Sequence, residues 1–86
     1  MEFVVYLLYS EKFDKTYVGY TSSLIERFKS HNSLSKTGFT KKFRPWIVVY
    51  VEIFNTKQAA MAREKWLKSG IGRSFIKNMK QNNFNI

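Results

Sequence analysis

With 86 residues, the chain is expected to form a single domain over residues 1–86, large enough for one hydrophobic core. Its 15 Lys and Arg against six Asp and Glu give a net charge of +9, which favours nucleic acid as a partner. A membrane is disfavoured as a partner, because no stretch has the apolar face or the length that a membrane helix needs. The lack of cysteine and the single histidine exclude disulfides, thiolate zinc sites and sites built from several imidazoles, so a metal would be held by carboxylate and water, as Mg²⁺ or Mn²⁺ is.

Two short strands are expected first. FVVYLLY, residues 3–9, is continuous and rich in β-branched and aromatic residues, which predicts a strand covered on both faces. After the turn-forming SEKFDK, TYVGY at 16–20 predicts a second strand and an antiparallel hairpin, in which Gly19 indicates a bulge or a close backbone approach. The acidic Glu2 and the early return of polar residues are not typical of a signal peptide, so a cytoplasmic location is expected.

A capped helix and a basic loop are expected next. Ser23 and Glu26 have the spacing of a capping box, which predicts a helix over about residues 23–32. Residues 33–45, SLSKTGFTKKFRP, combine turn-forming and basic residues without periodicity, which predicts an exposed loop. The candidate contacts to nucleic acid in this loop are Lys36, Lys41, Lys42 and Arg44.

The rest of the chain predicts one strand and two helices. WIVVYVEIF at 46–54 is the clearest strand, and Asn55 or Thr56 can cap a helix that is expected to stop at Gly70 in a left-handed conformation. GRSFIKNMKQ predicts a final short helix, and the last five residues are expected to be loosely held. The order strand, strand, helix, strand, helix, helix predicts an α+β fold, with a three-stranded antiparallel-type sheet flanked by three helices.

Arg27 and His31 are the first candidates for chemistry. With ~100° per residue of helix, they lie roughly 40° apart, so both side chains can point at one ligand. Arg27 suits a phosphate, because its planar guanidinium stays charged, although an arginine that extends from the helix edge is the alternative. His31 is either a phosphate donor and proton carrier near neutral pH or a simple cap at the helix end.

Tyr6, Tyr17 and Glu64 are the other candidates. Two phenols on neighbouring strands can face the same side of the sheet, with packing as the alternative; a free phenol, with a pKa of about 10, needs nearby positive charge or metal-bound water to act as a base. Glu64, at the edge of the apolar side of its helix, can be the protein ligand of a hydrated Mg²⁺ or form a surface ion pair. Lys65 and Lys68 beside it are further candidates for contacts with nucleic acid.

Together these residues resemble the GIY-YIG nuclease superfamily. Val4-Val5-Tyr6 stands where that family has Gly-Ile-Tyr, and Tyr17-Val18-Gly19 where it has Tyr-Ile-Gly. The family's arginine, histidine and glutamate positions are matched by Arg27, His31 and Glu64. The similarity is greatest to small stand-alone bacterial members related to the excinuclease nuclease domain, in which a lysine stands at the position of Tyr20.

The resemblance implies a metal-dependent endonuclease that hydrolyses DNA phosphodiester bonds and is directed by structure or weakly by sequence. It implies that Tyr17 activates or orients the attacking water with support from Tyr6, that Arg27 and His31 act on the phosphate, and that Glu64 holds Mg²⁺ or Mn²⁺. The alternative is a catalytically impaired nucleic-acid-binding module of the same fold, acting with a protein partner in DNA repair or recombination. Monomer and homodimer both remain open.

Overall fold

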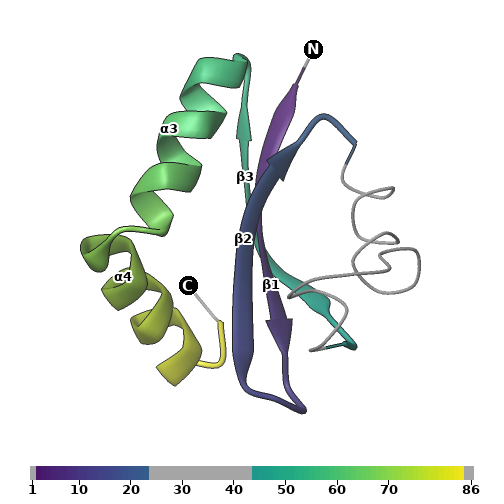
Figure 1. Cartoon of the computed structure of the whole chain (residues 1–86), viewed down its shortest axis with the longest axis vertical. Helices are drawn as coiled ribbons and strands as arrows, with labels where there is room; N and C mark the ends of the chain where they lie inside the picture. The colour runs from purple at the N-terminus through teal and green to yellow at the C-terminus, as the bar shows by residue number, and fades with distance from the viewer. Residues whose placement is uncertain (1, 24–43, 85–86) are drawn as a thin grey trace.

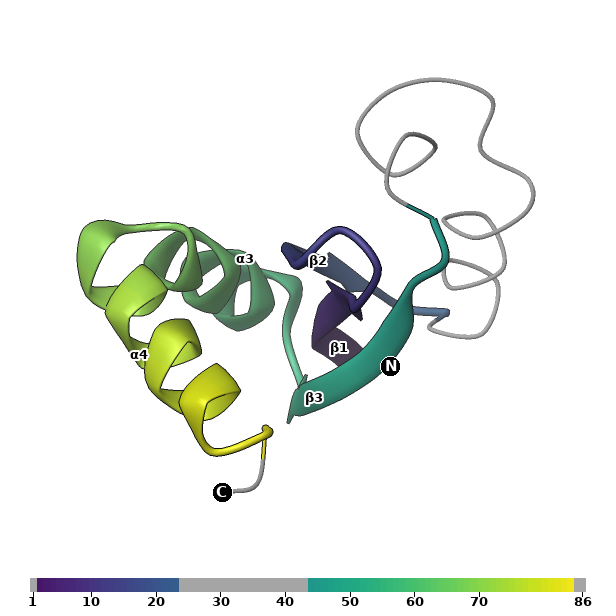
Figure 2. The same ribbon diagram turned by 90° about the horizontal axis from the view of Figure 1, so that it is seen from below.

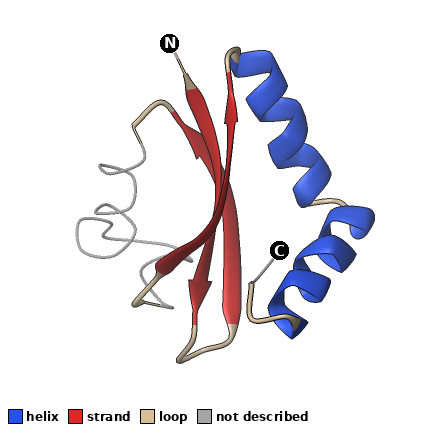
Figure 3. Cartoon of the chain, turned by 180° about the vertical axis from the view of Figure 1, so that it is seen from behind, coloured by secondary structure: helices blue, strands red, loops and turns tan. Residues whose placement is uncertain are grey.

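The computed structural model describes residues 2–23 and 44–84. Its strands are β1 (Phe3–Ser10), β2 (Lys15–Thr21) and β3 (Ile47–Phe54), and its helices are α3 (Lys57–Leu67) and α4 (Gly70–Gln81). The strands form one antiparallel sheet in the order β2-β1-β3, and both helices lie on the same side of it (Figures 1, 2 and 3). The predicted α+β class and sheet are confirmed, whereas the helix expected at about 23–32 lies almost wholly outside the described residues.

β1 is the central strand, because its side chains are apolar on both faces. Val5 and Leu7 pack with the buried residues of the two helices, whereas Tyr6 and Leu8 point to the other face and pack with Trp46. None of these five side chains is more than 1% exposed. The strand is therefore covered on both faces, as its continuous apolar sequence predicts.

β2 and β3 are the two edges of the described sheet. β2 pairs with β1 in a regular register that places Gly19 opposite Tyr6, so the predicted hairpin is confirmed. β3 pairs with the other side of β1, with a shift in register between Leu7 and Leu8. Because α3 packs against both β1 and β2, the free edge of β2 borders the helix layer.

The two helices meet at a short corner. The Thr56 hydroxyl accepts a hydrogen bond from the Ala59 N–H at 3.2 Å and caps α3, so Thr56 is the cap of the two predicted alternatives, Asn55 and Thr56. The prediction of a left-handed Gly70 is wrong: Ser69 caps a new helix by accepting a bond from Gly72 N–H at 3.3 Å, and Gly70 is the first residue of α4. Neither helix in the described part of the chain has the length and apolar character needed to cross a bilayer.

The segment after α4 ends with an aromatic ring, Phe84, that packs against the core. The Phe84 N–H donates to the Met79 carbonyl at 2.6 Å. The Phe84 ring lies 5.0 Å from that of Tyr9, between ring centroids, and packs against the main core. The expectation of a loosely held end is therefore wrong for Phe84, because its partly buried ring packs against the core, whereas Asn82 and Asn83 are exposed. Residues 85–86 lie outside the described part.

An arginine clamp joins β3 to both helices. Arg63 donates from Nε to Glu52 Oε1 at 2.7 Å and from Nη2 to Oε2 at 3.0 Å, and the Tyr50 hydroxyl also donates to Glu52. The guanidinium lies 4.2 Å from the centroid of the Trp66 ring and 5.6 Å from that of Phe75. Burial acts to raise the pKa of Glu52, but the bonds from Arg63 and Tyr50 outweigh it, so this pKa lies below its ordinary value.

Candidate functional site

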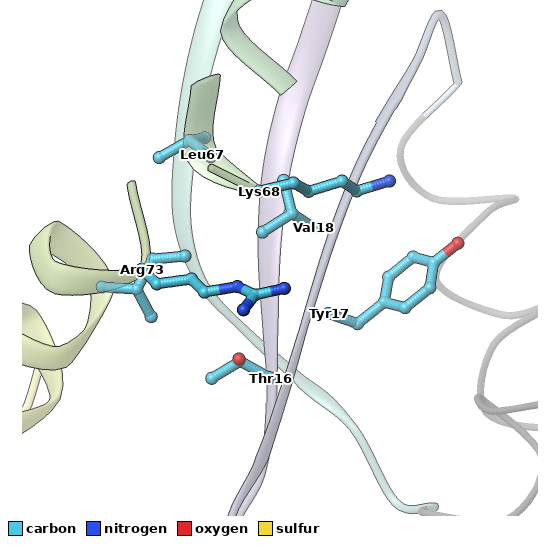
Figure 4. A pocket seen from close by; sticks show the side chains of 7 residues that line it. Thr16, Tyr17, Val18, Leu67, Lys68 and Arg73 are labelled. Atoms are coloured by element: carbon cyan, nitrogen blue, oxygen red, sulfur yellow. The ribbon is translucent and has the colours of Figure 1, made fainter. Parts of the chain in front are cut away.

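Tyr17, on the edge strand β2, lies where two pockets meet. Toward the end of β2 it lines a pocket of about 440 Å³ together with Gly19, Tyr20, Lys57 and Glu64, which we call the Glu64 pocket. Toward the start of β2 it lines a second pocket of about 290 Å³, shown in Figure 4, which we call the Arg73 pocket after one of its lining residues. The edge of the sheet therefore brings Tyr17 and Glu64 to one pocket although 47 positions separate them in the sequence.

Tyr6 lies behind the Glu64 pocket and does not line it. Its side chain is 1% exposed, and its ring lies 6.5 Å from that of Tyr17 at an angle of 27°, so the two phenols share a face as predicted. A Cβ at position 19 would meet the Tyr6 hydroxyl and would lie 2.6 Å from its Cζ. The predicted close approach at Gly19 is thus confirmed: the missing side chain leaves room for the Tyr6 phenol.

The aromatic face around Tyr17 is closely packed. The Tyr17 ring contacts Trp46 edge-on at a centroid distance of 6.3 Å. Its hydroxyl points away from α3 and α4, whereas Lys68 and Arg73 extend from the helix layer toward β2 (Figure 4). Tyr17 is therefore anchored by aromatic packing on one side of the strand and approached by cations on the other.

Glu64 forms the ion pair that is one of its two predicted roles and also lines a pocket. Its side chain is 23% exposed, lines the Glu64 pocket, and has Oε1 3.7 Å from Lys68 Nζ in the next helical turn. Among the described residues no group of three histidine, cysteine, aspartate or glutamate side chains gathers to hold a metal. A metal here would therefore have one described carboxylate ligand, which suits Mg²⁺ because that ion keeps several waters.

The pocket has room for such a hydrated ion. A water molecule occupies roughly 30 Å³ of liquid volume, and the Glu64 pocket measures about 440 Å³. The donor set and the space therefore fit a divalent ion held by Glu64 and water.

The structure gathers only part of the predicted site. Tyr17, Glu64 and Lys68 lie together around β2, with Tyr6 behind them. Lys65 is exposed and lines neither of the two pockets, and Arg44 is partly buried just before the buried Trp46. The predicted residues outside the described part of the chain are Arg27, His31, Lys36, Lys41 and Lys42.

Two basic residues of these pockets were not among the candidates from sequence. Lys57, the first residue of α3, lines the Glu64 pocket, and Arg73 of α4 lines the other. Arg73, Lys77 and Lys80 follow a spacing of four and three residues, which puts basic side chains on one side of a helix and could have indicated this side. No comparable pattern marks Lys57.

The sequence matches one family model and resembles several bacterial proteins. The model of the GIY-YIG catalytic domain matches residues 2–81. A UPF0213 protein of Staphylococcus haemolyticus is 38% identical over 58 residues, covering 67% of this chain and 71% of the relative. A UPF0213 protein of Streptococcus pyogenes serotype M3 is 37% identical over 70 residues, covering 80% of this chain and 76% of the relative.

A solved structure is similar along most of the chain. The solution NMR structure of a UPF0213 protein from Bacillus halodurans superposes with a TM-score of 0.54 and 28% sequence identity. The match covers 93% of this chain and 86% of the other. The two proteins therefore share one overall fold.

Proposed function

The chain belongs to the GIY-YIG catalytic domain family, and from this premise we propose that it is an endonuclease that hydrolyses DNA phosphodiester bonds with Mg²⁺ or Mn²⁺. The observation that carries the proposal is the Glu64 pocket, in which an edge-strand tyrosine and a helix carboxylate line one space. The family relationship supports a nuclease-type activity, and the net charge of +9 supports a nucleic-acid substrate.

In this proposal Tyr17 orients the attacking water and accepts its proton. Lys57 lines one of the two pockets that meet at Tyr17, and Lys68 and Arg73 line the other. These cations make the two pockets beside Tyr17 suited to the phosphate of the substrate, whereas the Tyr17 hydroxyl itself points away from the helix layer. Tyr20 stands where excinuclease-like members have a lysine. In this chain Lys57 lines the Glu64 pocket beside Tyr20 and so brings an ammonium group to the same pocket.

Tyr6 acts through position and not through contact with the substrate. Because it is buried and lies directly beneath Gly19, it fixes the backbone that forms the wall of the pocket. Arg27 and His31, matched to the family's motif, are assigned to the phosphate, where a guanidinium and an imidazolium can stabilise the developing charge.

Glu64 is the proposed ligand of the divalent ion. A bound ion supplies electrostatic stabilisation of the phosphate and of the leaving oxygen. Glu64 offers the carboxylate that such an ion prefers, in a pocket with space for its waters.

The test is cleavage of supercoiled, branched and single-stranded DNA with Mg²⁺, Mn²⁺ or EDTA. We expect metal-dependent cutting that Glu64→Gln reduces by about 100-fold or more. Glu11→Gln is the matched control, because it removes the same charge from the exposed hairpin end and should cut like the wild type. Equal cutting by Glu64→Gln would remove the metal assignment, and DNA binding without cutting by the wild type would favour the binding module.

A further inference from the structure

A groove continues from Tyr17 along the edge of the sheet. The Arg73 pocket shares Thr16, Arg73 and Ile76 with a third pocket of about 290 Å³. That third pocket is also lined by Asp14, Lys77 and Lys80, at the hairpin end of β2 and the last turns of α4. The Arg73 pocket and the third pocket therefore form one groove between β2 and α4, and this groove meets the Glu64 pocket at Tyr17.

α4 presents a basic side to this groove. Gly72, Ile76 and Met79 are the buried residues of the helix, which fixes its rotation on the core. Arg73 and Lys77 are exposed and flank Ile76 at the groove. From residue 73 to residue 80 the helix advances ~10 Å at ~1.5 Å per residue, so the basic side runs along the groove for that length.

Two of these charges have no counter-ion in the part of the chain that the structure describes. Lys80 pairs with Asp14 at 2.5 Å, and the hydrogen bond from Lys80 holds the pKa of Asp14 below its usual range. Arg73 and Lys77 form no ion pair with a described residue. The middle of the groove is thus positively charged, and its acidic groups lie at the two ends, each beside a lysine.

We propose that this groove binds the sugar-phosphate backbone of the DNA strand that flanks the cleaved bond, with Arg73 and Lys77 contacting phosphates. The inference rests on the proposed function and extends it, because it assigns a path to the strand on one side of the pocket. The basic side of α4, ~10 Å long, matches about three nucleotide steps, since phosphates along one strand of a duplex advance ~3.4 Å each. Ile76 and Thr16 line the groove floor between the charges and suit contacts with sugars.

The test compares two double variants with the same net charge. Arg73→Gln/Lys77→Gln removes the two groove cations, and Lys12→Gln/Lys15→Gln removes two exposed lysines that line none of the three pockets. Binding to a duplex of about 20 base pairs is measured in EDTA between about 50 and 200 mM salt, a range in which phosphate contacts set the slope. EDTA prevents cutting, so binding is measured apart from catalysis.

We expect the groove variant to flatten the plot of log K against log salt by about 1.8, at ~0.9 per lost contact, and the control variant to leave it nearly unchanged. Equal slopes for the two variants would overturn the proposal, because binding would then follow net charge and not the groove. If the two slopes were equal but cutting still depended on Glu64, this proposal would fail and the proposed function would stand. If the groove variant flattened the slope but cutting did not depend on Glu64, the proposed function alone would be refuted.

A second measurement locates the strand directly. The chain has no cysteine, so Lys77→Cys and Lys12→Cys each provide a single attachment point for a photo-crosslinker. We expect crosslinks to the same duplex from position 77 at least about tenfold above those from position 12. Equal yields from the two positions would contradict a strand in the groove.

Discussion

Replacement of Gly19 by alanine tests how the two tyrosines and the pocket wall depend on one another. A new Cβ would lie 2.6 Å from the Cζ of Tyr6, whereas carbon atoms in contact normally lie ~3.5–4.0 Å apart. The Tyr6 ring would have to move by about 1 Å. It cannot do so freely, because it is buried in a cluster with Leu8, Trp46 and Tyr17.

Such overpacking costs about 1–3 kcal/mol in the free energy of unfolding. For a domain of this size, 1 kcal/mol corresponds to about 4–8 °C, so a cost of about 2 kcal/mol lowers the melting temperature by about 8–16 °C. Thermal unfolding followed by circular dichroism measures this shift. Cutting should fall as well, because Gly19 forms the wall of the Glu64 pocket.

A double variant checks the cause. Tyr6→Leu removes both the hydroxyl and the Cζ that lie nearest to the new Cβ, so it should restore about 1 kcal/mol in the Gly19→Ala background, a coupling typical of residues in contact. Tyr6→Leu alone is the control. If Gly19→Ala melted like the wild type, or if the two changes were simply additive, the close approach would not be what requires glycine here.

Two further predictions concern stability. Arg63→Met should cost about 2 kcal/mol, of which about 1 kcal/mol is coupling to Glu52 in a double-mutant cycle with Glu52→Gln. Because the pKa of Glu52 is lowered in the folded state, the ionised carboxylate stabilises the fold above the unfolded pKa of about 4.3, and this stabilisation is lost as pH falls through the folded pKa. The free energies of unfolding of wild type and Glu52→Gln, measured in urea titrations, should therefore become equal below the folded pKa. A difference that stays constant with pH would contradict this. Gly72→Ala should lower the free energy of unfolding by more than about 2 kcal/mol. The new Cβ would lie 2.5 Å from the carbonyl carbon of Leu67, a backbone atom that cannot move aside as a flexible side chain can. Gly70→Ala, with open space around its Cβ, is the matched control and should be neutral or slightly stabilising by about 0.5 kcal/mol in thermal unfolding; similar losses for both would refute the packing argument.

The strands were the predictable part of this fold, because their signals are local. The apolar run of residues 3–9 indicates a strand buried on both faces, and Thr56 indicates a helix start through its own hydroxyl. The end of α3 was not predictable in the same way. A serine followed by glycine can end one helix or begin the next, and the choice of Ser69 as a cap depends on packing of Gly72 against the preceding turn.

The proximity of two candidate residues was predictable where a motif marks them. Tyr17 and Glu64 were selected from their spacing and from the family resemblance, and both line one pocket. Lys57 and Arg73 enter the site only because α3 and α4 fold back along β2, a tertiary arrangement that no local pattern states. Phe84 was misjudged for the same reason, since its contact with Tyr9 joins the two ends of the chain.

The corner between α3 and α4 fixes the distance from the Glu64 pocket to the basic side of α4. Only Lys68 and Ser69 separate the helices, and the Ser69 hydroxyl bonds to both, donating to the Trp66 carbonyl and accepting from Gly72 N–H. The two helices are therefore joined by a short corner that one side chain bonds on both sides. If DNA lies in the groove, the spacing between the reacting phosphate and the gripped phosphates is set by the protein, and a substrate that does not match it must itself bend.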